Sequence, residues 1–354
     1  MLSHRGPEPP RSRSGNDCTP RARLGIAALC ALALVVPGWS QESDPVHPLG
    51  YAYGDFGGLL TFLRAPYVRD LKALDADIAV LGVPFDEGTS SRPGARYGPR
   101  QIREASISYS WHRPSGGFYY IDGGRVTLKG KRWADCGDVE VVPTQPARTF
   151  ENVTEAVRAI VAKKAFPVIL GGDHSITFPV IRGLEASPLT LIHLDAHLDT
   201  WDSGPDDLGH AGWVLRVAKL PYVKNIVQIG MRGLANDRSA VENARRLGTT
   251  VITTEELRRD GLKAAIARIP RSERIYLSLD IDVVDPSLAP GTGTPEVGGL
   301  TFEEIDSLLQ AIPSRGRLIG MDLVEVEPYH DPGEVTPLTA ARLIVDLLGA
   351  ALKP

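Results

Sequence analysis

The chain has 354 residues, of which 43% are hydrophobic and 23% are charged. These fractions are typical of a water-soluble globular protein, and the length is sufficient for a sizeable core. The formal net charge of −4 excludes the strongly basic balance of a nucleic-acid-binding protein, so we expect no nucleic-acid partner.

The first 40 residues differ in composition from the rest of the chain. Five arginines precede an apolar run at residues 24–36, and the small residues Gly38 and Ser40 follow it. A basic segment, an apolar run and small residues near a cleavage site are the parts of a secretory signal. The run is too short for a stable membrane span. We therefore expect residues 1–40 to direct export to the periplasm or the exterior; a mitochondrial transit peptide and a misassigned start are the alternatives.

Removal of this segment would leave Cys136 as the one cysteine of the chain. No intrachain disulfide could then form, so the cysteine content suits an oxidising or a reducing compartment. Residues 41–74 are predicted to form an extended lead-in without clear periodicity. Residues 75–354 contain no linker or repeat and are predicted to form a single domain.

This domain alternates apolar runs, which predict buried strands, with segments of helical periodicity. Strands are predicted at residues 76–84, 168–170, 189–194, 226–230, 275–279 and 318–326. Helices are predicted at residues 99–106, 150–161, 208–217, 254–266, 302–309 and 336–352. Thr253 with Glu256, and Thr301 with Glu304, form capping-box patterns, and Thr336-Pro337 is predicted to open the last helix. The alternation predicts a parallel sheet covered by helices on both faces.

Two stretches between these elements are less regular. The loop at residues 85–99 is rich in Gly and Pro, which is typical of a shaped loop. Residues 107–148 contain aromatic residues and Gly pairs that predict hairpins or loops, and Cys136 to Val139 are placed at a strand end. The aromatic residues either form a wall of a substrate pocket or simply pack, and we favour packing.

Three of the predicted strands end in polar clusters. Residues 171–175 read Gly-Gly-Asp-His-Ser, residues 195–199 read Asp-Ala-His-Leu-Asp, and residues 280–282 read Asp-Ile-Asp. In open α/β sheets the chemistry lies at the carboxyl ends of the strands. If the second and third clusters stay extended, residues two apart face the same way and their side chains point into one space.

These clusters place two histidines and at least four aspartates together. So many carboxylates cannot share a buried pocket without compensating positive charge. Oxygen-rich ligands with some imidazole and no thiolate favour Mn²⁺ over a structural zinc. More than four ligands, with carboxylates able to bridge, indicate two ions about 3.5–4 Å apart. His193, which lies within a strand, and Asp173 are expected to support the ligands rather than to bind metal.

The motifs at residues 171–175, 195–199 and 278–286 resemble, in order and content, the metal motifs of the ureohydrolase family, which includes arginase, agmatinase and guanidinobutyrase. The resemblance covers about residues 75–350. It implies an α/β fold of the arginase/deacetylase type, a three-layer α/β/α sandwich with a mostly parallel sheet, and a homotrimer or homohexamer. It implies two Mn²⁺ per chain, one held by His174, Asp195, Asp199 and Asp280 and the other by Asp195, His197, Asp280 and Asp282, with Asp195 and Asp280 bridging.

The resemblance also implies that water activated by the two ions attacks a guanidino group. Glu325 matches the guanidinium-binding Glu of the family, and Glu327 occupies a nearby position where the family usually has a small or amide residue. Asp199 could relay a proton to the leaving amine. His210 matches a loop His that shuttles protons or lines the site, although Ala211 to Trp213 depart from the Gly and small hydroxyl residue usual after it.

Specificity is inferred from the loop after the second motif. Residues 200–209 are acidic, which suits a second positive charge on the substrate and repels a carboxylate. Residues 290–296 also resemble agmatinase more than arginase. We therefore expect hydrolysis of agmatine to putrescine and urea. Guanidinobutyrate, guanidinopropionate and arginine are the alternative substrates; a one-zinc, deacetylase-like amidohydrolase and a non-catalytic metal-binding protein are the less favoured alternatives from other classes.

Overall fold

The computed structural model describes residues 57–112, 116–121, 124–185, 187–204 and 207–352. The predicted export signal at residues 1–40 and the first part of the predicted lead-in lie outside these ranges. Among the helices that are described, none is long and apolar enough to cross a membrane.

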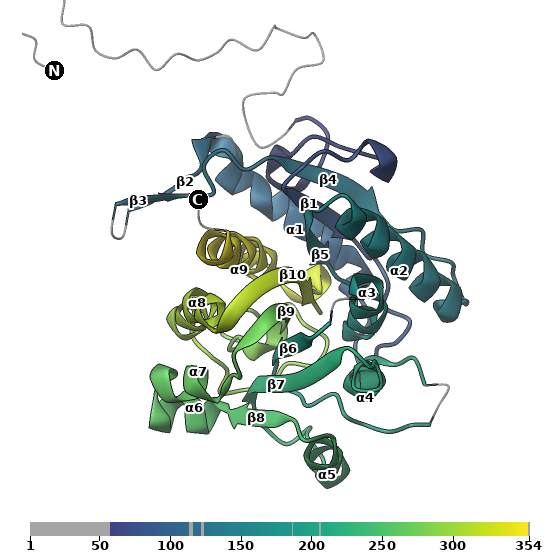
Figure 1. Cartoon of the computed structure of the whole chain (residues 1–354), viewed down its shortest axis with the longest axis vertical. Coiled ribbons are helices and arrows are strands. Elements are labelled where there is room, and N and C mark those ends of the chain that lie inside the picture. The colour runs from purple at the N-terminus through teal and green to yellow at the C-terminus, as the bar shows by residue number, and fades with distance from the viewer. Residues whose placement is uncertain (1–56, 113–115, 122–123, 186, 205–206, 353–354) are drawn as a thin grey trace, which may run out of the picture. The chain divides into compact units, whose positions relative to one another are not determined.

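An eight-stranded sheet runs through the domain, in the order β4-β1-β5-β10-β9-β6-β7-β8 (Figure 1). Every neighbouring pair in it is parallel. The strands are β1 (Ile78–Gly82), β4 (Trp133–Asp138), β5 (Phe166–Leu170), β6 (Leu189–Leu194), β7 (Val223–Met231), β8 (Thr250–Thr253), β9 (Ser272–Asp280) and β10 (Gly316–Val324). All residues of β5 and β6 are buried, as expected for strands covered on both faces.

Helices cover both faces of this sheet and enclose two large hydrophobic clusters, so the domain has three layers (Figure 1). The first cluster receives buried side chains from α1 (Gly98–Ser106), α6 (Thr254–Asp260), α7 (Leu262–Arg268), α8 (Phe302–Ala311) and α9 (Val335–Ala351). The second receives them from α2 (Pro146–Ala162), α3 (Thr177–Leu184) and α4 (Trp213–Val217). Helix α5 (Arg238–Leu247) packs in a third, smaller cluster beside Leu198 and Met231. The predicted α/β sandwich with a parallel sheet is confirmed.

The helix starts that were predicted from capping boxes are also confirmed. The hydroxyl groups of Thr253 and Thr301 accept the backbone N–H of Glu256 and Glu304, and both glutamates bond back. The single helix predicted after Thr253 is wrong, however. Gly261 has φ +85°, which an α-helix does not accommodate, and the chain therefore forms α6 and α7 on either side of it.

Two other helix predictions need correction. The last helix begins at Val335 after Glu334, and the Thr336 side chain does not cap it, because its hydroxyl accepts the Gly291 N–H at 2.8 Å. The helix predicted at residues 208–217 is reduced to α4, preceded by a 3₁₀ turn, η7 (His210–Gly212).

Residues 107–148 form a short antiparallel hairpin, β2 (Phe118–Tyr120) with β3 (Arg125–Thr127), before the edge strand β4. Trp133 is buried and stacks on Phe62 with ring centroids 6.1 Å apart. The Tyr120 hydroxyl donates a hydrogen bond to Asp346 of α9. Trp133 and Tyr120 therefore pack, as we favoured, whereas Tyr119 is exposed.

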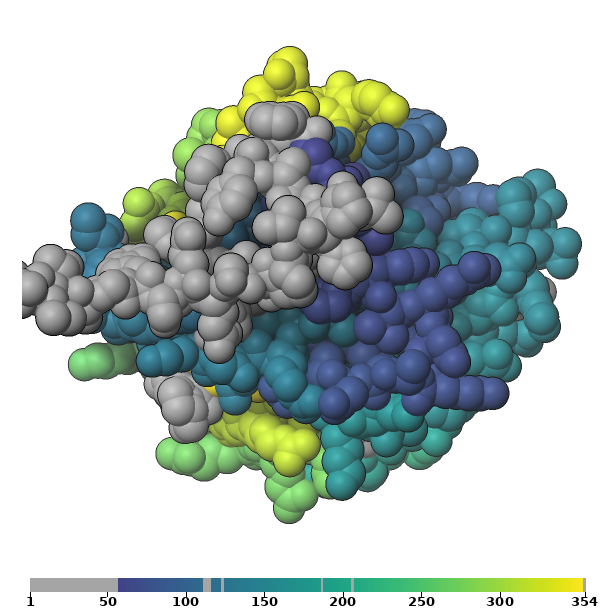
Figure 2. Space-filling model, turned by 90° about the horizontal axis from the view of Figure 1, so that it is seen from above, coloured from purple at the N-terminus to yellow at the C-terminus, as the bar shows by residue number. Residues whose placement is uncertain are grey.

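The described part of the lead-in covers the edge of the sheet. It contains the 3₁₀ turns η1 (Phe62–Arg64) and η2 (Leu71–Ala73), and Tyr67 forms a parallel bridge with Asp135 of β4. In Figure 2 these residues form the purple surface beside the teal and blue segments. Covering β4 protects its otherwise unpaired backbone groups.

Candidate metal centre and active site

Four neighbouring central strands, β5, β10, β9 and β6, carry the polar residues predicted from sequence. His174 follows β5, Glu325 follows β10, Asp280 ends β9, and Asp195 follows β6. Because all four strands are parallel, their carboxyl ends lie at one edge of the sheet, where open α/β folds place their chemistry.

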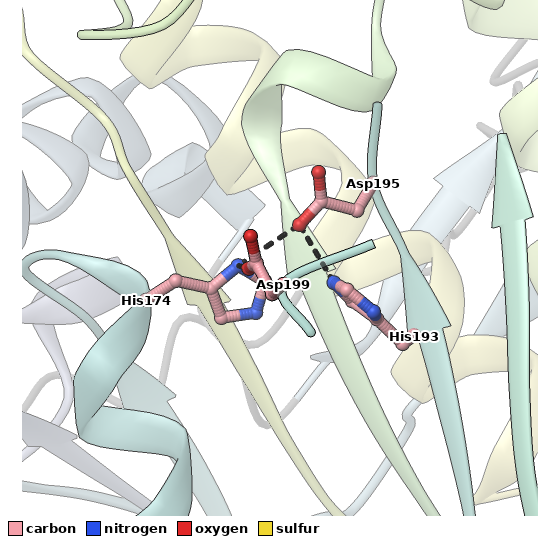
Figure 3. Close-up of side chains that lie close together, drawn as sticks. All are labelled: His174, His193, Asp195 and Asp199. Carbon is pink, nitrogen blue, oxygen red and sulfur yellow. Dashed lines mark hydrogen bonds and ion pairs between the residues drawn. The ribbon is translucent and has the colours of Figure 1, made fainter. Parts of the chain in front are cut away.

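A first group forms around the His174 ring. Its Nδ1 lies 3.0 Å from Asp195 Oδ2, 3.4 Å from Asp199 Oδ2 and 3.0 Å from Asp280 Oδ2. Figure 3 shows His174, Asp195 and Asp199 directed toward one another, with His193 on the far side of Asp195. One imidazole nitrogen therefore faces three carboxylate oxygens. Ligand atoms of His174, His193, Asp195 and Asp199 lie within 4.8 Å of one another, close enough to hold one metal ion, whereas Asp280 contacts His174 without belonging to that group.

A second group forms around His197. Its Nδ1 lies 3.0 Å from Asp282 Oδ2 and 3.4 Å from Asp195 Oδ1. The two oxygens of Asp195 thus face different groups, which is the arrangement of a bridging carboxylate. Asp280 differs, because its Oδ1 accepts the Asp282 N–H at 2.8 Å and only Oδ2 faces a histidine among the described contacts.

The clusters converge for a reason other than the predicted one. Residues 195–199 are not extended, since Asp199 has φ +50°, and residues 281–283 form the short 3₁₀ turn η8 (Ile281–Val283) with Asp280 as its N-cap. The prediction of strand periodicity after the strands is therefore wrong. Curled loops bring the same side chains together, and the left-handed conformation at a non-glycine residue is typical of a functional constraint.

The carboxylates of the cluster repel one another, and the histidines compensate for part of their charge. Burial raises the pKa of the Asp280 carboxyl well above its usual range, and the charge of Asp282 raises it further. Burial also raises the pKa of Asp199, as does the charge of Asp195. Burial opposes protonation of His174, but its hydrogen bonds to Asp195 and Asp280 outweigh this and raise its pKa well above the usual value. A carboxylate-rich pocket with this need for positive charge fits hard divalent cations such as Mn²⁺.

Several residues around the cluster hold its members in place. His193 Nε2 lies 2.6 Å from Asp195 Oδ2, and the Gln228 side chain lies 3.2 Å from His193 Nδ1. His193 lies close enough to His174, Asp195 and Asp199 to offer a nitrogen to the same ion, but its contacts match the supporting role predicted for it. Sequence reasoning missed Gln228, although a polar residue within the apolar run at 226–230 was a signal.

Trp213 was noted in the sequence only as a departure after His210. Its indole Nε1–H donates to Asp199 Oδ2 at 2.7 Å. The ring also stacks on His174, with centroids 4.7 Å apart and planes inclined by 27°. Trp213 is fully buried, so it fixes the position of two members of the first group.

Glu325 links this cluster to the His210 loop. Glu325 Oε1 accepts the His174 backbone N–H at 2.7 Å and lies 2.8 Å from His210 Nδ1. The Ser90 backbone N–H donates to His210 Nε2 at 3.0 Å, and because an amide can only donate, this ring carries its proton on Nδ1. Burial lowers the pKa of His210, but the Glu325 carboxylate outweighs this effect and raises it to about 9. His210 can therefore take a second proton on Nε2, which would then donate to Ser90 Oγ, 2.7 Å away, in place of accepting the Ser90 N–H.

The comparisons with known proteins agree with this geometry. A model of the arginase family matches residues 76–349. The chain is 36% identical over 304 residues to mitochondrial guanidino acid hydrolase of Homo sapiens, covering 84% of each chain. It is 34% identical over 303 residues to agmatinase of Chromobacterium violaceum, covering 83% of this chain and 88% of that protein. The solved structure of proclavaminate amidino hydrolase from Streptomyces clavuligerus is similar with a TM-score of 0.74 at 32% identity, covering 84% of this chain and 98% of that one.

Proposed function

The chain belongs to the arginase family and is a ureohydrolase that cleaves guanidino compounds, and we propose that its substrate is agmatine, hydrolysed to putrescine and urea. The observation that carries this proposal is the buried Glu325 carboxylate, which bonds directly to the backbone of His174. This contact supports the proposal, because it holds an acceptor for a guanidinium beside the carboxylate and imidazole cluster. A guanidinium held there is oriented for attack at its central carbon.

We propose two Mn²⁺ per chain as the cofactor. Their proposed ligands are His174, Asp195, Asp199 and Asp280 for one ion and Asp195, His197, Asp280 and Asp282 for the other. When bound, such a pair of ions lowers the pKa of a water molecule so that hydroxide is available near neutral pH. Removal of a bound metal should release two equivalents per chain, whereas one equivalent would favour a deacetylase-like site.

The protein's own groups would then orient the substrate and move protons. Glu325 holds the guanidinium through its carboxylate. Asp199 lies at the edge of the first group and is proposed to pass a proton to the leaving amine. His210 joins Glu325 to the loop at residues 207–210, and its Nδ1 proton places it to exchange protons with that carboxylate.

The loop after β6 supports a dicationic substrate. Asp202 is exposed and accepts the Gly204 N–H, and Asp207 is partly exposed and accepts the Gly209 N–H. Both carboxylates lie in the loop that leads from β6 to the His210 turn, so they favour a second positive charge on the substrate and disfavour a carboxylate.

A guanidino acid is the second candidate substrate. The exposed Arg92 lies near enough to Glu327 for its charge to lower the pKa of that carboxyl. An arginine at this position could pair with the carboxylate of guanidinobutyrate or guanidinopropionate. The two curated relatives, a guanidino acid hydrolase and an agmatinase, are similar to the chain at almost the same identity.

Urea release from agmatine, 4-guanidinobutyrate and arginine by the Mn²⁺-loaded protein tests the proposal. We expect the highest kcat/KM for agmatine, and a selective loss of agmatine turnover in a variant with Asp202→Asn and Asp207→Asn. A preference for guanidinobutyrate that disappears in Arg92→Gln would replace agmatine by a guanidino acid. The absence of urea from every guanidino compound, with metal bound, would favour a non-catalytic protein.

Two predictions concern where and in what form the protein acts. We propose that residues 1–40 direct its export, supported by their basic, apolar and small-residue order. Cell fractionation with N-terminal sequencing of the mature protein tests this, and a mitochondrial location would support the alternative. The homotrimer or homohexamer implied by the family is tested by light scattering.

A further inference from the structure

Glu327 is a buried carboxylate that the fold does not require. Its side chain is 0% exposed, and neither of its oxygens accepts a hydrogen bond from any described residue. The nearest cation partner is His330, whose Nε2 lies 3.3 Å from Glu327 Oε2 without the geometry of a hydrogen bond. A buried carboxylate in this condition lowers stability unless a ligand satisfies it.

Most of the unsatisfied groups belong to two adjoining segments, residues 325–327 and the loop at residues 290–296. In the described part of the chain, six buried side-chain polar atoms have no hydrogen-bond partner, and four of them are Thr292 Oγ1, Glu325 Oε2 and both oxygens of Glu327. All but one of these four atoms are carboxylate oxygens, which only accept hydrogen bonds when ionised. The ligand that fits them is therefore a cation with several N–H donors.

The hydrogen bonds of Glu325 leave one of its two oxygens available for a guanidinium. A guanidinium presents its N–H groups as a planar fork that fits two acceptor oxygens. Glu325 Oε1 already has the His174 N–H at 2.7 Å and His210 Nδ1 at 2.8 Å, which fill its two lone pairs. Within the described residues this leaves Oε2 as its one unsatisfied oxygen.

Glu327 is placed to supply the missing acceptors. Its backbone N–H donates to Gly291 O at 2.8 Å, which fixes it two residues after Glu325 against the loop at 290–296. A Cβ on Gly293 would lie 2.6 Å from Glu327 Oε1, and one on Gly94 would lie 3.6 Å from Glu327 Cβ, so glycines line both sides of the side chain. Burial raises the pKa of Glu327, and the charges of Glu325 and Asp86 raise it further, to about 8. A bound cation would lower this pKa again and favour the ionised carboxylate.

We propose that Glu327 is a second substrate-binding carboxylate, which accepts guanidinium N–H groups that Glu325 cannot accept. The inference rests on the proposed function, because it assigns the guanidino group of the substrate to this site. Glu325 Oε2 and the Glu327 carboxylate then hold the cation between them, and Thr292 Oγ1 is available as a further acceptor.

Steady-state kinetics of Glu327→Gln tests the proposal, because this change keeps the shape of the side chain and removes its charge. We expect KM for agmatine to rise about 10- to 100-fold, as for loss of a charged hydrogen bond, with kcat little changed. Titration calorimetry with methylguanidinium should show the same loss of affinity. The ligand-free variant should melt at a higher temperature than the wild type, which a merely structural role would not produce.

His330→Gln is the matched control, because it removes the side chain whose Nε2 lies 3.3 Å from Glu327 Oε2 and leaves Glu327 in place. It should leave KM and methylguanidinium affinity unchanged. Equal effects of the two variants on stability with no change in KM would overturn the proposal and make Glu327 a partner of His330. A wild type that cleaves no guanidino compound would overturn the proposed function, and the calorimetry would still decide whether Glu327 binds the cation. Glu327→Ser repeats the test if the Gln variant does not fold.

Discussion

Gly172 is the position at which adding a single methyl group should cause the largest loss of activity and stability. Residues 171–175 follow β5 and pack closely against the loop after β1. A Cβ on Gly172 would therefore lie 1.7 Å from the carbonyl oxygen of Phe85. The same oxygen accepts the Asp173 N–H at 2.8 Å, and the Gly172 carbonyl accepts the Glu325 N–H at 2.8 Å. The contact is with backbone, so no side-chain rotation can relieve it in Gly172→Ala.

The size of the effect follows from this distance. Real Cβ contacts are essentially never shorter than 3.0 Å, so one of the two backbones must retreat by about 1.3 Å. The displacement would be passed to His174 and Glu325, which are bonded to each other and to this turn. Misplacement of a catalytic group by about 1 Å costs on the order of 100-fold in rate. Overpacking adds a loss of about 1–3 kcal/mol in the free energy of unfolding.

The assay is urea release by the Mn²⁺-loaded protein, together with thermal unfolding of the same samples. We expect Gly172→Ala to lose about 100-fold or more in kcat/KM and to melt several degrees lower, at about 2–4 °C per kcal/mol. Gly333→Ala is the control, because its new methyl group would lie 3.4 Å from the nearest atom, an ordinary contact. Wild-type activity and melting temperature in Gly172→Ala would refute the reasoning.

Three further predictions concern the metal cluster and Glu327. Chelation of Mn²⁺ should lower the melting temperature reversibly, because each ion present at 100 times its Kd stabilises the native state by about 2.7 kcal/mol; equal melting with and without metal would contradict the assigned cluster. Trp213→Phe should weaken Mn²⁺ binding about 10-fold in calorimetry, because Asp199 loses its indole N–H, and an unchanged affinity would show that this contact does not position the ligand. Glu327 faces Glu325, Asp86, Arg92, His210 and His330, and its pKa is about 8 in the folded protein against 4.5 in the unfolded chain. The loss of folding free energy that comes from ionising this buried carboxyl is therefore absent below about pH 4.5 and complete above pH 8. The melting temperature of metal-free Glu327→Gln should therefore exceed that of the wild type increasingly as the pH rises from 5 to about 8, and a constant difference would contradict this pKa.

The sequence predicted the fold because its signals were local and repeated. Apolar runs and helical periodicity located the central strands and most helices, and the capping boxes at Thr253 and Thr301 located two helix starts. One error lies where a single residue's backbone conformation decides the outcome, whereas α3, α5 and β8 were not predicted at all. Periodicity continues across Gly261, but its φ of +85° ends one helix and starts another.

The sequence predicted which residues come together at the candidate site, but not the backbone geometry that brings them together. The predicted ligands meet because parallel strands end at one edge, which the sequence pattern implied. Periodicity could not show that Asp199 adopts φ +50° or that Glu325 adopts φ +61°, because these conformations depend on tertiary contacts. The same reason explains why Trp213 and Gln228 were missed, since each acts through a contact with a residue distant in the chain.

The acidic edge of the sheet combines two proposed cation sites, which are linked through His174. On one side, Asp195 divides its oxygens between the groups of His174 and His197. On the other side, Glu325 and Glu327 keep unsatisfied oxygens within the described structure. The His174 backbone N–H joins the two sides through its bond to Glu325 Oε1. Fixing His174 in a metal site would therefore also fix the carboxylate that we propose to hold the substrate, so metal binding should strengthen guanidinium binding despite the repulsion between the two cations.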